Sequence, residues 1–287
     1  MQKYTVKDNG GGRIDLFILE KQPHLSRSYV QKLSKQDKIL VNGKPAKPSH
    51  KLKAGDKIVL QYDPSEDIKI PEIDLPIIYE DDDLLVIDKP AGVLPHSKGN
   101  FNPEATVASF IQGRSKKLGD GRDGIVHRLD RATSGVMIVA KSPEAQAFLQ
   151  KEFASRRAHK TYVAIIEGHL KPVEAVIDMP IERNPKKPST FRVGSNGKPA
   201  QTTYKALKSV ANYDLVELKP RTGRTHQIRV HMSKMGHPIV GDTLYKGIVA
   251  DRLFLHAAEL KIKLPTGEQK TFSSIMPKLF NEYIKND

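Results

Sequence analysis

The segment Gly124-Ile-Val-His-Arg-Leu-Asp-Arg-Ala-Thr-Ser-Gly-Val-Met-Ile-Val-Ala-Lys141 is the most informative stretch of this chain of 287 residues. Its apolar run at 136–140 predicts a buried strand, and Thr133-Ser134-Gly135 predicts a turn before it. Asp130 therefore lies in a loop beside a rigid strand, between Arg128 and Arg131. Positive neighbours favour an ionised carboxylate, which can attack or remove a proton at neutral pH. On spacing alone, a structural ion pair explains the same residues.

Apolar runs on both sides of this segment predict further strands. They occupy residues 84–87, 162–166, 213–218 and 228–230. Ser142, followed by Pro143 and Glu144, predicts the start of a helix. Because these strands do not alternate regularly with helices, we expect an α+β domain. Its central sheet should be mixed, mainly antiparallel, and flanked by helices and loops.

The first 63 residues predict a separate small α/β domain. Helical spacing of apolar residues follows Ile14, and a second helix is expected after Ser26, with short strands at 39–41 and 57–60. The motifs Gly12-Arg-Ile-Asp15, Ser26-Arg27, Val41-Asn-Gly-Lys44 and Leu52-Lys-Ala-Gly-Asp56 resemble the S4-type RNA-binding domain. Arg27, at the start of a helix, is the candidate phosphate contact.

Charge is distributed unevenly along the chain: two basic regions flank a short acidic one. The net charge is +14, which favours a polyanionic partner, above all RNA. Residues 1–63 hold 13 basic and 6 acidic residues, whereas residues 64–83 hold 1 basic and 8 acidic residues. We therefore expect an RNA-binding domain at 1–63, an acidic linker at 64–76 and a catalytic domain at 77–287.

Composition excludes several classes of protein. The chain has no cysteine, so disulfides, thiol nucleophiles and Cys-ligated zinc are excluded. No apolar run reaches the roughly 18 residues of a membrane span, and residues 1–16 lack the apolar core of a secretory signal. We expect a cytoplasmic protein with no membrane association, and a monomer.

The segment His127-Arg-Leu-Asp130 with Thr133-Ser-Gly135 is similar to the active-site signature of the large-subunit ribosomal RNA uridine synthase family, which makes pseudouridine. Further segments resemble the family in the same order, over residues 77–272. They are Lys89-Pro-Ala-Gly92, Lys160-Thr-Tyr-Val-Ala164, Gly197-Lys-Pro-Ala200, Arg221-Thr-Gly-Arg-Thr-His-Gln-Ile-Arg229, Gly236-His-Pro-Ile-Val-Gly-Asp242 and Leu255-His-Ala257.

The resemblance implies the roles of several residues. Asp130 would be the catalytic carboxylate that starts cleavage of the glycosidic bond of a flipped uridine, without metal or cofactor. Tyr162 would stack on the uracil, and Arg224 would pair with Asp130. Leu255 would pack under the base, and Arg128 would enter the space that the flipped nucleotide leaves.

RNA contacts are also expected in a basic stretch of the catalytic domain, at Lys186, Lys187 and Arg192, where a solvated run of charge is the alternative. Two other functions fit parts of the sequence: a non-catalytic RNA-binding factor and a nucleic-acid N-glycosylase. The resemblance favours large-subunit ribosomal RNA as the substrate, although related enzymes act on transfer RNA, and the identity of the modified uridine stays open.

Overall fold

The computed structural model describes residues 1–7, 12–23, 25, 27–62, 71–96, 104–112, 114–115 and 124–285. They form two compact units, a smaller one of Met1–Glu72 with Ser97–Ala105 and a larger one of Ile73–His96 with Thr106–Asp287. Residues 64–70 of the expected linker, and the expected helix cap Ser26, lie outside the described residues. The linker therefore stays a prediction.

The smaller unit packs two helices on a short sheet, as expected from its sequence. Helices α1 (Ile14–Lys21) and α2 (Arg27–Lys35) lie between β1 (Gln2–Thr5) and the strands β2 (Ile39–Val41), β3 (Lys44–Pro45) and β4 (Lys57–Leu60) in the chain. The strands pair antiparallel in the order β1-β4-β2-β3. Fully buried aliphatic side chains from both layers, including Ile14, Val30, Ile39 and Leu60, form its core.

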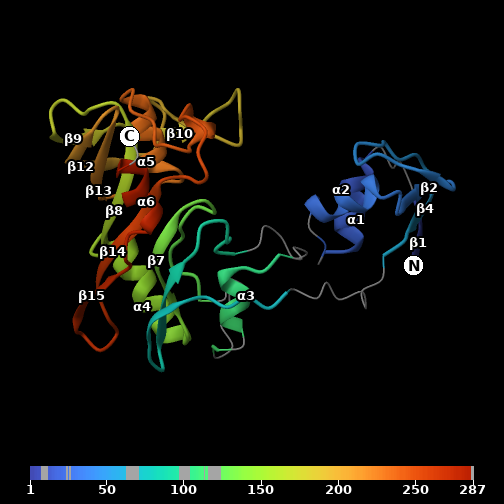
Figure 1. The fold of residues 1–287 in the computed structure, drawn as a ribbon. Helices are drawn as coiled ribbons and strands as arrows, with labels where there is room; N and C mark the ends of the chain where they lie inside the picture. The colour runs from blue at the N-terminus through green and yellow to red at the C-terminus, as the bar shows by residue number, and fades with distance from the viewer. Residues whose placement is uncertain are drawn as a thin grey trace. The chain divides into compact units, whose positions relative to one another are not determined.

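A large twisted sheet dominates the larger unit (Figure 1). Its strands run in the order β5-β6-β7-β14-β8-β13-β12-β9, and β15 pairs with β14. Among the described strands only β7 and β14 pair in parallel, which confirms the mainly antiparallel mixed sheet. The bounds are β5 (Ile77–Glu80), β6 (Leu84–Lys89), β7 (Ser134–Ala140), β8 (His159–Glu167), β9 (Glu174–Asp178), β12 (Gln201–Val210), β13 (Tyr213–Pro220), β14 (Leu255–Lys263) and β15 (Gln269–Ser273).

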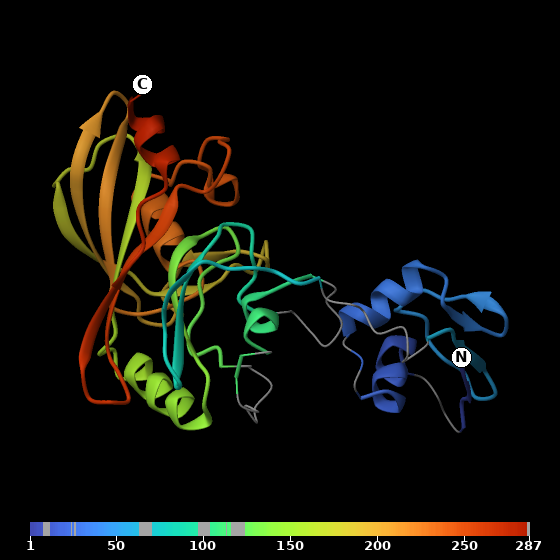
Figure 2. The same cartoon turned by 60° about the horizontal axis from the view of Figure 1, so that its bottom comes forward.

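Helices cover both faces of the β6–β7 part of the sheet (Figure 2). Side chains alternate along a strand, so Val86 and Ile138 pack toward α4 (Pro143–Ala154), whereas Ile87 and Met137 pack in the same cluster as α3 (Val107–Gln112). Burial on both faces explains why these strands are apolar without alternation. The α4 helix begins as predicted, because the Ser142 side chain accepts a hydrogen bond from the Ala145 N–H.

The sequence prediction of a strand at 228–230 is wrong, because these residues lie in helix α5 (Gln227–Lys234). Ile228 and Met232, four residues apart, both pack into the main core on one side of the helix. Helix α6 (Lys278–Lys285) packs into the same core through Phe280 and Ile284. The short hairpin of β10 (Ile181–Arg183) and β11 (Phe191–Val193), and the 3-10 turn η1 (Thr243–Tyr245), lie outside the large sheet.

Candidate active site

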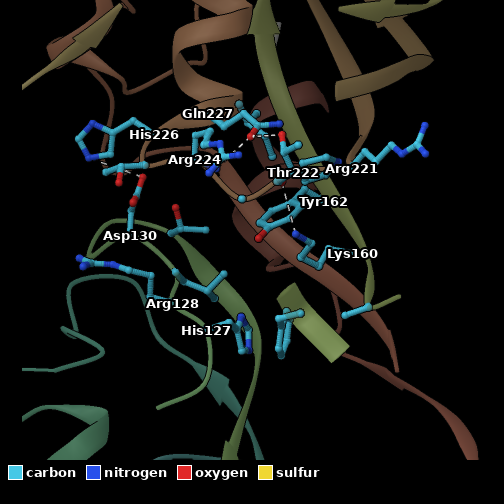
Figure 3. Close-up of a pocket in the computed structure, with 18 of the residues that line it drawn as sticks. His127, Arg128, Asp130, Lys160, Tyr162, Arg221, Thr222, Arg224, His226 and Gln227 are labelled. Carbon is cyan, nitrogen blue, oxygen red and sulfur yellow. Dashed lines mark hydrogen bonds and ion pairs between the residues drawn. The ribbon is translucent and has the colours of Figure 1, made fainter. Parts of the chain in front are cut away.

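A cavity of about 620 Å³ opens where β8, β14, α5 and the loop before β7 meet (Figure 3). It brings together most residues that the sequence singled out in the catalytic domain: Arg128, Asp130, Tyr162, Arg224 and Leu255. Six Arg and Lys side chains line the cavity, against a single carboxylate, Asp130. This balance suits a polyanionic ligand.

The loop that carries Asp130 is anchored on both sides by backbone contacts. Thr133 N–H donates to the Asp130 carbonyl at 3.1 Å, closing a turn. Gly135, the second residue of β7, has φ +115°, and a Cβ at this position would collide with the Ala257 carbonyl of β14. Glycine is therefore required for the close approach of the two strands that position the loop.

The buried side chain of Lys89 also holds this loop in place. Lys89 is fully buried, and its Nζ donates to the carbonyls of Pro90, Val93 and Arg131 at 2.8, 2.9 and 3.3 Å. Burial lowers the pKa of Lys89 to about 7, although the charge of Asp130 opposes this shift. The segment Lys89-Pro-Ala-Gly92 thus supports the Asp130 loop, a role that sequence reasoning missed.

The arginine that contacts Asp130 is Arg229, at 3.2 Å from Nη1 to Oδ2. Its Nε and Nη2 hold both oxygens of Asp242 at 2.7 and 2.8 Å, so one guanidinium joins two carboxylates. Arg229 is 8% exposed. Because it lies in the first turn of α5, its side chain points back toward the start of the helix, where the Asp130 loop lies.

The predicted pair of Asp130 with Arg224 is therefore wrong. Arg224 lies in the loop before α5, and its Nε donates to the Pro199 carbonyl at 3.1 Å. Its backbone N–H donates to Gln227 Oε1 at 3.0 Å. Two arginines five positions apart in one motif are not distinguished by spacing. The start of the helix at Gln227 is the feature that places the second of them against the carboxylate.

His226 is the second neighbour of Asp130, and sequence reasoning did not assign it to the carboxylate. Its Nε2 lies 3.8 Å from Asp130 Oδ2, and its Nδ1 lies 2.7 Å from the Tyr245 hydroxyl. Burial lowers the pKa of His226, against the opposing effect of the Asp130 charge. A largely neutral imidazole follows for neutral pH.

Tyr162 and Leu255 provide an apolar surface in the cavity, on the adjacent strands β8 and β14. Tyr162 is 9% exposed, and burial, followed by the charge of Asp130, raises the pKa of its hydroxyl. The phenol is therefore neutral, with a ring face suited to stacking. The expected grouping of Tyr162, Leu255 and Asp130 in one cavity is confirmed; their roles stay predictions.

Lys160 projects into the cavity two residues before Tyr162, on the same side of β8 (Figure 3). Its Nζ donates to the Thr222 carbonyl at 3.4 Å. Burial lowers the pKa of Lys160 to about 8. No carboxylate lies within ion-pair distance of its ammonium among the described residues.

His127 has a structural environment, although it lines the cavity. Its Nε2 accepts the Ile138 N–H at 3.1 Å, and its ring stacks on Phe153 with centroids 4.4 Å apart. Burial and, to a lesser degree, Lys160 lower the pKa of His127 to about 3. Next to it, Arg128 is exposed, as the role predicted for it requires.

The other predicted RNA contacts do not line the cavity. Lys186 and Lys187 are exposed between β10 and β11, and the half-exposed Arg192 lies 2.7 Å from Glu182. Arg27, in the smaller unit, is 55% exposed and lies 3.2 Å from the buried Asp15. Their RNA contacts stay predictions.

The described residues contain no group of three potential metal ligands of the types His, Cys, Asp and Glu. None of the described helices has the length and apolar character needed to cross a membrane.

Comparisons with known proteins agree with this fold. Residues 83–234 match the RNA pseudouridylate synthase family, and residues 12–58 match the S4 domain. The chain therefore belongs to the RNA pseudouridine synthases and has an S4 RNA-binding domain at its N-terminus.

Curated relatives support this membership over most of the chain. Ribosomal large subunit pseudouridine synthase D of Salmonella typhimurium is 38% identical over 248 residues, covering 85% of this chain and 76% of its own. Ribosomal large subunit pseudouridine synthase C of Vibrio cholerae is 35% identical over 288 residues, covering 92% and 89%. The solved structure of human RNA Pseudouridylate Synthase Domain Containing 1 matches with a TM-score of 0.60 and 30% identity, over 72% of this chain and 84% of that one.

Proposed function

We propose that this enzyme isomerises specific uridines of large-subunit ribosomal RNA, with Asp130 as its catalytic carboxylate and the target nucleotide flipped into the cavity. The supporting observation is the placement of Asp130: it is the single carboxylate of a basic cavity, paired with Arg229 and sharing that cavity with Tyr162. Arg229 donates a hydrogen bond to this carboxylate and orients it, which any role as nucleophile or base requires.

The reaction needs little from the protein beyond this carboxylate and a binding surface. The bond between uracil N1 and the ribose C1′ breaks, the uracil turns, and C1′ rejoins at C5. C5 loses its proton and N1 gains one, so the product is an isomer of the substrate. Asp130 starts the cleavage by attacking the sugar, attacking the base or removing a sugar proton, and the three routes stay open. The neutral Tyr162 would stack on the uracil and hold it during rotation.

The proposal for the substrate rests on the relatives and on charge. The two bacterial relatives are ribosomal large subunit enzymes by name. The S4 domain and the net charge of +14 provide the surface for RNA phosphates. We propose that the enzyme works as a cytoplasmic monomer.

The decisive test replaces the carboxylate without changing its size. Asp130→Asn should abolish pseudouridine formation on a ribosomal RNA transcript and leave the RNA Kd within a few fold. Asp251→Asn, which removes an equal charge at an exposed position outside the cavity, is the matched control and should keep the wild-type rate. Pseudouridine formation by the Asp130 variant would refute the assignment.

Products separate the competing functions. An N-glycosylase would release free uracil, which a synthase retains, and a non-catalytic binding factor would leave the RNA unchanged. Mapping pseudouridines in ribosomal and transfer RNA from cells that lack this protein would identify the substrate.

A further inference from the structure

His226 is held between the proposed catalytic carboxylate and a buried tyrosine. Its Nε2 faces Asp130 Oδ2 at 3.8 Å, and its Nδ1 contacts the Tyr245 hydroxyl at 2.7 Å. His226 has φ 56°, which lies in the left-handed region that residues other than Gly seldom adopt. Such a conformation costs on the order of 1 kcal/mol and persists where the surroundings fix it. The contacts around His226 thus hold it in this conformation.

The Tyr245 hydroxyl also has a second partner, which favours donation of its proton to His226. Its oxygen accepts the N–H of Phe191, the first residue of β11, at 2.9 Å. The hydroxyl proton then remains for His226 Nδ1. With Nδ1 as acceptor, a neutral imidazole carries its proton on Nε2, the atom that faces Asp130.

The charges around His226 agree with a neutral ring. Burial lowers its pKa, and the positive charges of Arg229 and Arg128 act in the same direction, whereas Asp130 and Asp242 oppose them. The rings of Phe191 and Tyr245 meet the imidazole edge to face, with centroids 5.6 and 5.5 Å away. Two aromatic rings therefore pack against the imidazole and limit its rotation.

We propose that Tyr245 and His226 are positioning residues for Asp130. The Tyr245 hydroxyl selects the His226 tautomer whose Nε2–H points at the carboxylate, and the Phe191 N–H ties this pair to the β10–β11 hairpin. An approach of about 1 Å would turn the 3.8 Å contact into a hydrogen bond. Asp130 is then oriented from two sides, by Arg229 and by His226. This inference rests on the proposed function of Asp130.

The first test measures the tautomer and needs no activity. Nitrogen NMR of protein labelled in its histidines should show, for His226 at pH 7, a protonated Nε2 and an unprotonated Nδ1 that accepts a hydrogen bond. Tyr245→Phe should remove that hydrogen bond from Nδ1. Tyr204→Phe is the matched control, because it removes one buried hydroxyl that donates to the Pro172 carbonyl outside the cavity. A proton on Nδ1 in the wild type would overturn the proposal.

The second test measures rate and affinity separately. Tyr245→Phe should lower the single-turnover rate of pseudouridine formation about 10-fold, the effect of removing one hydrogen bond, with an unchanged RNA Kd. Tyr204→Phe should match the wild type in both. Equal rates for the two variants would overturn the positioning role.

A pair of substitutions at His226 distinguishes positioning from packing. The Gln amide nitrogen can occupy the place of imidazole Nε2, so His226→Gln should be faster than His226→Ala by several fold. Equal rates would contradict the proposal. A wild type that makes no pseudouridine would instead refute the proposed function, and the NMR result would still decide how His226 is held.

Discussion

Replacing Arg229 by Lys tests which arginine supports Asp130, the proposed catalytic carboxylate. Arg229 makes three charge-assisted hydrogen bonds, two to Asp242 and one to Asp130. A lysine keeps the charge but has one nitrogen, which cannot span both carboxylates in this fork geometry. The short bonds to Asp242 are the ones a lysine would keep, so the hydrogen bond to Asp130 would not form.

The size of the effect follows from that single hydrogen bond. A hydrogen bond to a charged group contributes about 1.5 to 3 kcal/mol, and about 1.4 kcal/mol corresponds to a factor of ten in rate. Arg229→Lys should therefore lower the single-turnover rate about 10- to 100-fold, with RNA affinity nearly unchanged. Tritium release from RNA labelled at uracil C5 measures this rate.

Arg224→Lys is the matched control, because Arg224 lies in the same motif and lines the same cavity but bonds to the Pro199 carbonyl. It should keep the rate within a few fold of the wild type. A large loss in Arg224→Lys together with a wild-type rate in Arg229→Lys would refute the reasoning.

Two further predictions concern charge. Burial lowers the pKa of Lys160 to about 8, from 10.5, so between these values the unfolded chain binds a proton that the folded chain releases. The free energy of unfolding of the wild type should therefore rise with pH relative to that of Lys160→Met; urea unfolding from pH 7.5 to 9.5 measures this, and a constant difference would contradict the shift. Deleting residues 1–63 should weaken RNA binding and flatten its salt dependence, by roughly 0.7 to 0.9 in log–log slope for each phosphate that the shortened protein no longer binds; an unchanged slope in a salt titration would remove the RNA role of this domain.

The sequence predicted the class of the fold because its signals are local and consistent. Ser142 and Pro143 mark the start of α4 through the chemistry of helix caps, and the doubly buried strands β6 and β7 appear as short apolar runs. Asp130 was found for a similar reason, since its loop is defined by the turn before β7.

The strand prediction at 228–230 failed because three residues are too few to distinguish a period of two from a period of 3.6. Ile228 and Val230 alternate with Arg229, as in a strand, and only Met232 one turn later shows the helix. The assignment of Arg224 rested on the resemblance of a motif that also contains Arg229, and the motif alone does not show which of the two arginines faces Asp130. A strand would not direct Arg229 back toward the loop of Asp130, whereas the first turn of a helix does.

Lys89 was missed because a buried ammonium has no sequence signature. Its three partners are backbone carbonyls, and one of them, that of Arg131, is 42 residues away in the chain. Only the tertiary structure shows that Lys89, the last residue of β6, holds the carbonyl of Arg131, which is next to Asp130 in the chain.

The cations that line the cavity matter because both Asp130 and the RNA substrate are negatively charged. The proposed reaction needs an ionised carboxylate, but RNA brings phosphates whose negative charge raises the cost of that anion. Six cationic side chains around one carboxylate offset this cost, and they attract the phosphates at the same time. Among the described residues, only Arg229 lies within hydrogen-bond distance of the Asp130 carboxylate, so the remaining cations of the cavity can contact RNA. A neutral His226 fits this arrangement, because a proton on Nε2 supports the carboxylate without adding a charge that would compete with Arg229.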